Sequence, residues 1–446
     1  MWARLISAAA LGSFLLVRLA VASIQVDSSE VIRALGVSTN AQLAEKLRPA
    51  VESFQRREYD QSLELLRKLV AENPSFPPAS LMQAEMFVMT RQSAMALASL
   101  ERAAVEDPKY PGIYVTFGQL SLAEGRLTSA ALHFERALVL SERWERITVY
   151  ARQFRTRSYS GLADVAERRG DWGSARVALE KWLELEPENT GARQRFAQAL
   201  FRLDKHTDAL NELKRASKED GSLAPADTSM GMFWASISEV AKAEASFQYA
   251  VKYYPQNPMG HYRYAGWLLS QDRAKEAAEA ALVAARLRPE SPEIRALQGL
   301  IATYLKRPEE AERFFQALSQ EAPAVFSYSN QLALSLADQA APEKRARAMQ
   351  LAAVNARTYS GSREALATLG WTYYRLGDLD EAERILRQAV TGTGVGGNAA
   401  YFLARVLVDR GDKETAEKLL KAALSAQGVF PSKKDAKKLL DKMTRN

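Results

Sequence analysis

The sequence predicts an all-α protein made of stacked antiparallel helix pairs. One unit of roughly 34 residues recurs from about residue 43 to residue 428, and a period in this range is typical of stacked supersecondary units. Each unit carries Gly or Ala early, Ala in the middle and Pro near its end. A chain of 446 residues is too long for one ordinary hydrophobic core, whereas each unit of an array packs only against its neighbours.

The first 22 residues have the composition of a secretory signal peptide. A positively charged start is followed by thirteen apolar or small residues (5–17), and Ala20-Val21-Ala22 offers a small-x-small cleavage site. The apolar run is shorter than the roughly 20 residues that span a bilayer. Arg18 lies between this run and the cleavage site, where signal peptides usually carry no charge. Two alternatives therefore stay open: an uncleaved membrane anchor over residues 5–24, and the N-terminal helix of a cytoplasmic protein.

Residues 23–42 are predicted to form a short N-terminal helix that precedes the array. Asp27 or Ser28 is suited to cap this helix, because either side chain accepts a hydrogen bond from a backbone N–H group of the first turn. Glu30 then falls in the first turn, as is usual at the start of a helix.

Within each unit, the spacing of apolar residues predicts two helices. Unit positions 4, 7, 8 and 11 share one face of a first helix, and positions 20, 24 and 27 share one face of a second helix. Small residues at positions 8 and 20 allow the two backbones to approach closely, and larger side chains at position 24 fill the space around them. Pro at position 32 ends the second helix. A glycine near position 15 is predicted to end the first helix in the left-handed conformation; such glycines are Gly125, Gly170, Gly377 and Gly411.

The unit at 363–390 shows this pattern most completely, with Leu369, Gly370, Tyr373, Gly377, Ala382, Leu386 and Ala389. The pattern resembles that of the tetratricopeptide repeat (TPR) family. The resemblance implies a right-handed superhelical solenoid of antiparallel helix pairs, with about eleven repeats. We place their starts near residues 43, 77, 111, 156, 190, 224, 258, 292, 326, 363 and 397.

Two segments interrupt the regular spacing, and one follows the array. Residues 143–155 contain no Pro or Gly and are predicted to extend a helix. Residues 337–356 form an insertion in the unit that begins near 326. Residues 429–446 are predicted to form a basic amphipathic helix that caps the array, since a terminal repeat needs a polar outer face.

Charge and residue types exclude several classes of function. The net charge is +7, but the last fifteen residues alone carry six Lys or Arg and two Asp. The repeats lack the concentrated basic stripe that nucleic-acid binding needs. The chain contains no cysteine, and its three histidines do not have the spacing of metal ligands. GTGVGG (392–397) matches a dinucleotide-binding loop, but it follows a predicted helix instead of a strand. We therefore expect no enzyme activity, cofactor or metal.

In the TPR family the first helices line a concave groove, and positions 2, 5, 9, 12 and 13 point into it. Trp371 is at position 9 of its repeat. The chaperone-binding members grip a C-terminal carboxylate with Lys or Arg and Asn at positions 5, 6 and 9. Positions 6 and 9 hold no such Asn in the second to fifth repeats, so the resemblance does not extend to that carboxylate clamp. The resemblance makes these the candidate groove residues: Arg157, Asp164, Arg168, Gln194, Gln198, Arg202 and Tyr262.

Together these observations predict a non-enzymatic scaffold or adaptor that binds protein or peptide partners in its groove. The signal-like N-terminus favours the periplasm or cell envelope of a bacterium, with attachment to the inner membrane or a cytoplasmic location as alternatives. A second hypothesis is an accessory subunit of an envelope machine for polysaccharide synthesis and export or for protein secretion.

Overall fold

The computed structural model describes residues 26–35, 41–74, 76–144, 148–392, 395–426 and 430–444, and in these residues every regular element is an α-helix. The predicted signal peptide lies outside the described residues. Eleven helix pairs follow one another, and this confirms the all-α array of helix pairs. The pairs are α3 (Ala41–Gln55) with α4 (Tyr59–Glu72), α5 (Ala79–Met89) with α6 (Ser93–Glu106), α7 (Pro111–Ala123) with α8 (Leu127–Glu142), α9 (Thr148–Arg169) with α10 (Trp172–Leu185), α11 (Thr190–Arg202) with α12 (His206–Glu219), α13 (Ala226–Ser236) with α14 (Val240–Tyr253), α15 (Pro258–Ser270) with α16 (Ala274–Leu287), α17 (Pro292–Tyr304) with α18 (Pro308–Glu321), α19 (Phe326–Ala337) with α20 (Pro342–Thr358), α21 (Arg363–Leu376) with α22 (Leu379–Ala389), and α23 (Gly397–Asp409) with α24 (Lys413–Ser425).

Two further described helices flank these pairs. α2 (Ser28–Ala34) precedes α3, and the carboxylate of Asp27 accepts a hydrogen bond from the Ser29 N–H at its start. α25 (Lys433–Thr444) follows α24 and packs against α24 and α23. Ala436 of α25 is buried in the same apolar cluster as the last repeats.

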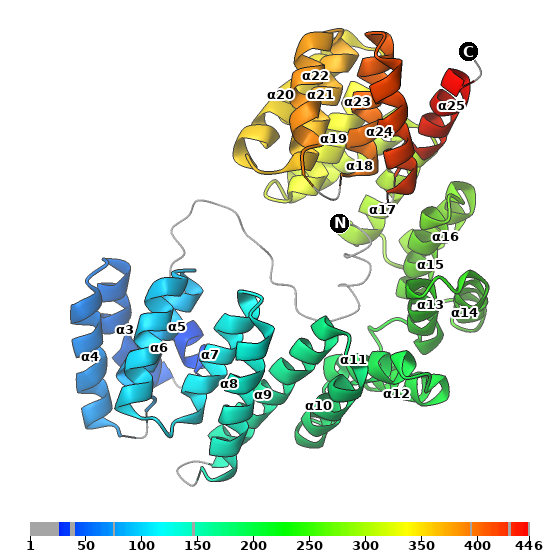
Figure 1. Ribbon diagram of the computed structural model, residues 1–446. Coiled ribbons are helices and arrows are strands. Elements are labelled where there is room, and N and C mark those ends of the chain that lie inside the picture. The colour runs from blue at the N-terminus through cyan, green and yellow to red at the C-terminus, as the bar shows by residue number, and fades with distance from the viewer. Residues whose placement is uncertain are drawn as a thin grey trace. The chain divides into compact units, whose positions relative to one another are not determined.

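The described part of the chain divides into two compact units, one within residues 26–220 and the other within residues 221–444. In the described residues, the first unit holds α2 to α12 and the second holds α13 to α25. Within each unit the two helices of a pair pack together, and the second helix packs on the first helix of the next pair (Figure 1). First helices such as α19, α21 and α23 also contact one another in sequence, so each unit has a face made of first helices.

A residue in the left-handed conformation separates the two helices of a pair. The four glycines predicted for this role all have positive φ, between 72° and 91°. The same position 15 has positive φ in six other repeats, where the residue is not glycine: Arg57, Arg91, Asp204, Ser238, Asp272 and Lys306. The backbone geometry of the turn is therefore common to ten of the eleven pairs, and glycine is only its least strained solution.

The close approach of the two helices occurs at position 8, as the sequence predicts. A Cβ atom added to Gly118 would lie 2.6 Å from the Phe134 ring, and one added to Gly370 would lie 2.6 Å from Cγ of Leu386. Phe134 and Leu386 occupy position 24 of the same repeats and are fully buried. Gly161 of the following repeat also approaches the Phe134 ring closely, with a Cβ added there 2.3 Å from Cζ, so this ring joins one repeat to the next.

Proline ends the second helices where predicted. α6, α10, α14 and α16 each stop two residues before Pro108, Pro187, Pro255 and Pro289 respectively. The residue that precedes a proline is pushed out of the helical region by a steric clash, and proline itself has no N–H for the helix to use.

Parts of both irregular segments, 143–155 and 337–356, are helical. α9 begins at Thr148, before the regular start near 156, and has 22 residues. Arg143 and Trp144 are not helical. Of the helical extension predicted over 143–155, the described structure therefore has only the later part, which begins at Thr148. The insertion at 337–356 lengthens α20 to 17 residues, whereas most second helices have 14. Among the described residues, none of the helices combines the length and apolarity needed to cross a bilayer.

Candidate functional site

A cavity of about 470 Å³ opens on the first-helix face of the second unit. α19, α21 and α23 supply most of its walls, and the residues that open α25 close one side. We call this cavity the aromatic pocket, after four of its lining residues: Trp371, Tyr374, Tyr401 and Phe402. Trp371 and Tyr374 occupy positions 9 and 12 of their repeat, and Tyr401 occupies position 5 of the next, which are groove positions in the resemblance described above.

Stacked rings make the apolar part of this pocket rigid. The ring centroids of Trp371 and Phe402 lie 4.3 Å apart with an interplanar angle of 17°, and Trp371 also stacks on Tyr374 at 4.9 Å. Such offset-stacked pairs contribute about 0.5–1.5 kcal/mol each beyond their buried area. Trp371 is 7% exposed, so it belongs to the core and lines the pocket at the same time.

The carboxylate of Asp338, whose side chain is 43% exposed, holds the indole of Trp371 in place. The Trp371 Nε1–H donates to Oδ1 of Asp338 at 2.9 Å, and Arg375 donates to the backbone carbonyls of Ala337 and Asp338. Partial desolvation beside α21 raises the pKa of Asp338 above its ordinary value of 3.8, and the hydrogen bond from Trp371 and the charge of Arg375 offset this only in part. The C-terminal end of α19 is thereby joined to α21.

A chain of polar side chains starts at the hydroxyl of one of the stacked rings, that of Tyr374. Arg405 Nε donates to the hydroxyl of Tyr374 at 2.9 Å, and that hydroxyl donates to Asp409 at 2.7 Å. Burial raises the pKa of Tyr401 to about 12. From α25, Asp435 forms an ion pair with Lys306 at 2.6 Å, which connects the end of the chain to the turn between α17 and α18.

One acceptor in the pocket has no hydrogen-bond partner among the described residues. The Oδ1 atom of Asn398, at position 2 of its repeat, is buried and unpaired. An unpaired buried acceptor costs about 1–3 kcal/mol unless a donor reaches it. The pocket is therefore lined by stacked rings, by Asn398 and by more cations than carboxylates, since Lys306, Arg307, Arg375 and Arg405 line it against Asp338 and Asp435.

The lining of this pocket shows no activated nucleophile. The hydroxyl of Ser335 donates to the carbonyl of Gln331, and the lining residues include no histidine that could activate it. In the described part of the chain, no group of three or more His, Cys, Asp or Glu side chains is arranged to hold a metal ion.

The groove residues predicted in the first unit mostly contact other parts of the same unit. Arg157 donates to the backbone carbonyl of Ala34 at 2.7 Å and to Gln119 Oε1 at 2.8 Å. Arg168 donates to the carbonyl of Leu122 at 3.0 Å. A partner at these residues would have to compete with existing hydrogen bonds, and their role as a groove stays a prediction.

Asp164 takes part in a salt bridge between repeats that the sequence does not reveal. Arg195 of α11 donates to Asp164 at 2.6 Å and to Glu167 at 3.0 Å, both on α9. Its guanidinium also lies 5.5 Å from the ring centroid of Trp182. Burial raises the pKa of Glu167 despite the neighbouring Arg195. Position 6, which Arg195 occupies, therefore joins two repeats here.

The remaining predicted groove residues lie in different units. Gln194 and Gln198 are half-buried on α11, and the guanidinium of Arg202 lies 5.4 Å from the ring centroid of Trp172. Tyr262 belongs to the second unit, where it is half-buried on α15 and burial raises its pKa. The structure thus gives Tyr262 a setting separate from the other six residues.

The aromatic pocket itself left a signal in the sequence. Aromatic residues occupy positions 9 and 12 of one repeat and positions 5 and 6 of the next, whereas positions 5 and 9 of the repeats around 157–202 hold Ser160, Asp164, Gln194 and Gln198. The sequence did not indicate that Asp338 would accept a hydrogen bond from Trp371. Asp338 lies in the irregular segment 337–356, where the repeat positions cannot be assigned from the sequence.

A linear array of helix pairs with a ligand-sized pocket on its first-helix face defines a class of protein-interaction scaffolds. Models of the tetratricopeptide repeat family match residues 167–226 and residues 50–111, 237–292 and 367–429, which together make up just over half of the chain. The chain belongs to the tetratricopeptide repeat family.

Several solved structures are similar to this chain. Yeast Tom70 is 13% identical, with 90% of this chain and 95% of that chain covered and a TM-score of 0.35. The Cut9–Hcn1 hetero-tetramer of APC/C is 13% identical, with 95% and 99% covered and a TM-score of 0.42. A thermophilic TPR protein of Thermus thermophilus is 17% identical, with 42% and 100% covered and a TM-score of 0.36. No curated protein sequence matches the chain significantly.

Proposed function

We propose that this protein is a non-enzymatic scaffold that binds an extended segment of a partner protein in the aromatic pocket. The observation that carries the proposal is the unpaired Oδ1 of Asn398 beside the stacked rings of Trp371 and Phe402. A backbone N–H of a bound segment would supply the missing donor, and an apolar side chain of the same segment would fill the space against the rings.

The charges around the pocket favour a partner with acidic residues beside its apolar anchor. Four cations and two carboxylates line the cavity, and Lys306 is held near the opening by its ion pair with Asp435. Complementary charge raises the rate of association and suppresses wrong partners. We therefore expect an extended peptide with one large apolar residue flanked by Asp or Glu.

In-cell photo-crosslinking tests the pocket directly. A photoreactive amino acid at Tyr401 should capture a partner that mass spectrometry identifies, and the same residue at Leu282, exposed on the second helix α16, is the matched control. Asn398→Leu should remove the captured partner, whereas Lys418→Ala on the exposed face of α24 should not. Equal capture at Tyr401 and Leu282 would contradict the proposal.

We also propose that the protein works at the bacterial cell envelope. Three features of its N-terminus support this proposal: the charged start, the short apolar run and the Ala20-Val21-Ala22 site. Cell fractionation with N-terminal sequencing tests this. A mature chain that begins at Ser23 in the periplasm would support it, and an intact Met1 in the cytosol would contradict it. A glycosyltransferase or a secretin among the crosslinked partners would favour the accessory-subunit hypothesis.

A further inference from the structure

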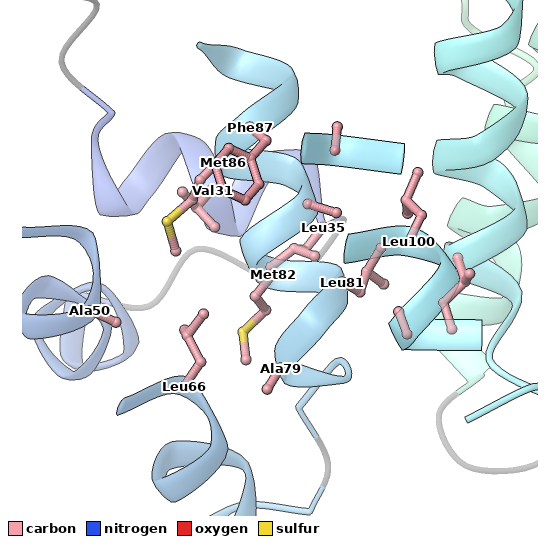
Figure 2. Close-up of a cluster of buried hydrophobic side chains, with 14 of the residues drawn as sticks. Val31, Leu35, Ala50, Leu66, Ala79, Leu81, Met82, Met86, Phe87 and Leu100 are labelled. Atoms are coloured by element: carbon pink, nitrogen blue, oxygen red, sulfur yellow. The ribbon is translucent and has the colours of Figure 1, made fainter. Parts of the chain in front are cut away.

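The segment before the first repeat lies on the first-helix face of the first unit, as a bound ligand would. α2 packs against α3 and α5, which are the first helices of two successive repeats. Val31 and Ile32 are 0% and 1% exposed, and they share one apolar cluster with Leu81 and Met82 of α5. Figure 2 shows Val31 and Leu35 beside the α5 side chains.

Side chains from the groove also hold the segment at both ends through its backbone. Gln55 Nε2 donates to the carbonyl of Val26 at 2.7 Å, and Arg157 donates to the carbonyl of Ala34 at 2.7 Å. The Ala34 carbonyl ends a helix, so it lacks an intrahelical donor. Gln55 is at position 13 of the first repeat and Arg157 is at position 2 of the fourth, and both are groove positions.

The same groove positions in the intervening repeats organise Arg157. Its guanidinium donates to Gln119 and lies 3.9 Å from Glu85, and these residues are at position 9 of the third and second repeats. Glu85 in turn accepts a hydrogen bond from Thr116 at 2.6 Å. Four successive repeats therefore contribute to the site, whereas a helix that only covered the end of the array would pack against the first pair.

We propose that this face is a docking site for an amphipathic helix of a partner protein, and that residues 26–35 are an intramolecular occupant which the partner displaces. The partner helix carries apolar residues at the spacing of Val31, Ile32 and Leu35, and its last carbonyls accept from Arg157. The site is distinct from the aromatic pocket and does not depend on the function proposed for that pocket.

Tethering explains how so short a segment holds the site. Only residues 36–40 connect the segment to α3, and a short tether gives an effective concentration on the order of millimolar. A segment that binds in trans with a dissociation constant of about 0.1 mM would then fill the site about ten times out of eleven. To displace the segment, a partner must therefore bind the site at least about tenfold more tightly than the free segment would, or be present at a high local concentration.

A labelled peptide with the sequence of residues 24–37 serves as the probe, and fluorescence anisotropy measures its binding to the full-length chain. Releasing the tethered segment with Val31→Asp and Ile32→Asp should strengthen peptide binding about tenfold or more relative to the wild type. Adding Arg157→Ala to that variant should weaken binding again by about tenfold, since it removes a charge-assisted hydrogen bond. A peptide that carries the same two Asp substitutions is the control and should not bind.

A second experiment distinguishes release of the segment from unfolding of the variant. A protease site placed within residues 36–40 allows the tether to be cut after folding, with every contact of the segment intact. The cut protein should keep its helical circular dichroism and exchange its segment for labelled peptide within hours. Absence of exchange in the cut protein, or equal peptide binding by wild type and variant, would show that residues 26–35 are a permanent part of the core and would overturn the proposal.

Discussion

A single residue at position 15 has the left-handed conformation in the turn of almost every repeat. Six of these residues carry a side chain in the left-handed conformation, which costs about 1–2 kcal/mol relative to the right-handed helical region. The turn persists because the packing of two helices determines it. At each of these six positions, the present residue therefore makes the protein less stable than glycine would.

Replacing Ser238 with Gly should stabilise the protein by about 0.5–1 kcal/mol, because the relief of backbone strain exceeds the added entropy of the unfolded chain. Ser238 is exposed and has a φ of 63°. Thermal unfolding measures the effect. The reverse change at the same repeat position, Gly377→Ala, should destabilise the protein, and an unchanged midpoint in both variants would refute this account of the turn.

Two glycines on first helices should respond in opposite ways to the same substitution. Gly299→Ala should cost about 1–3 kcal/mol, because the new Cβ would lie 2.8 Å from the ring of Phe315 and overpack the helix pair. Gly266→Ala should stabilise by about 0.5–1 kcal/mol, because its Cβ would meet nothing within 4 Å and alanine favours the helix. Chemical denaturation of both variants compares them, and effects of equal sign would contradict the packing at position 8.

At the scale of elements, the two helices of a repeat have different tasks. Second helices such as α14 bury the residues at positions 20, 24 and 27 inside the pair, where Ala243, Phe247 and Ala250 are all fully buried. First helices pack against neighbouring helices of the array on two sides. Their remaining face carries the polar and aromatic residues of the groove. A buried charge can therefore lie on this face, as Glu85 of α5 does with 4% exposure.

The stability of the second unit should depend on pH through Asp338. Its pKa is raised in the folded protein, so the folded state holds this proton more tightly than the unfolded chain. The free energy of unfolding contributed by this group is therefore highest below a pH of about 4, the unfolded pKa, and falls as the pH rises through the folded pKa.

Asp338→Asn should remove this dependence, so that the variant gains stability relative to the wild type as the pH rises from about 4 to 7. Urea denaturation at several pH values measures the difference. Asp60→Asn, at an exposed aspartate of α4, is the control and should show no such gain. A constant difference between wild type and Asp338→Asn across the range would contradict the assignment.

At the scale of the whole molecule, each compact unit has its own apolar clusters. In the described residues, the clusters around Phe54, Phe134 and Leu179 lie within residues 20–220, and those around Phe247 and Leu386 lie within residues 221–446. Because stability in a repeat array is a sum of local terms, a core defect should be felt mainly near its own repeat.

Phe134→Ala and Phe315→Ala should each cost about 3–5 kcal/mol, since both rings are almost fully buried. Hydrogen exchange with mass spectrometry should show the loss of protection concentrated in residues 20–220 for the first variant and in residues 221–446 for the second. A uniform loss along the chain in either variant would argue against local cores.

The sequence by itself determined the helix pairs, because their spacing, small residues and terminal prolines are local properties repeated along the chain. Gly118 against Phe134 and the stops before Pro108 follow from that local pattern. Only the tertiary structure decided that Asp338 supports Trp371 and that Arg157 holds the carbonyl of Ala34, 123 positions away in sequence. Such contacts reach beyond one repeat, so the pattern within a repeat carries no information about them.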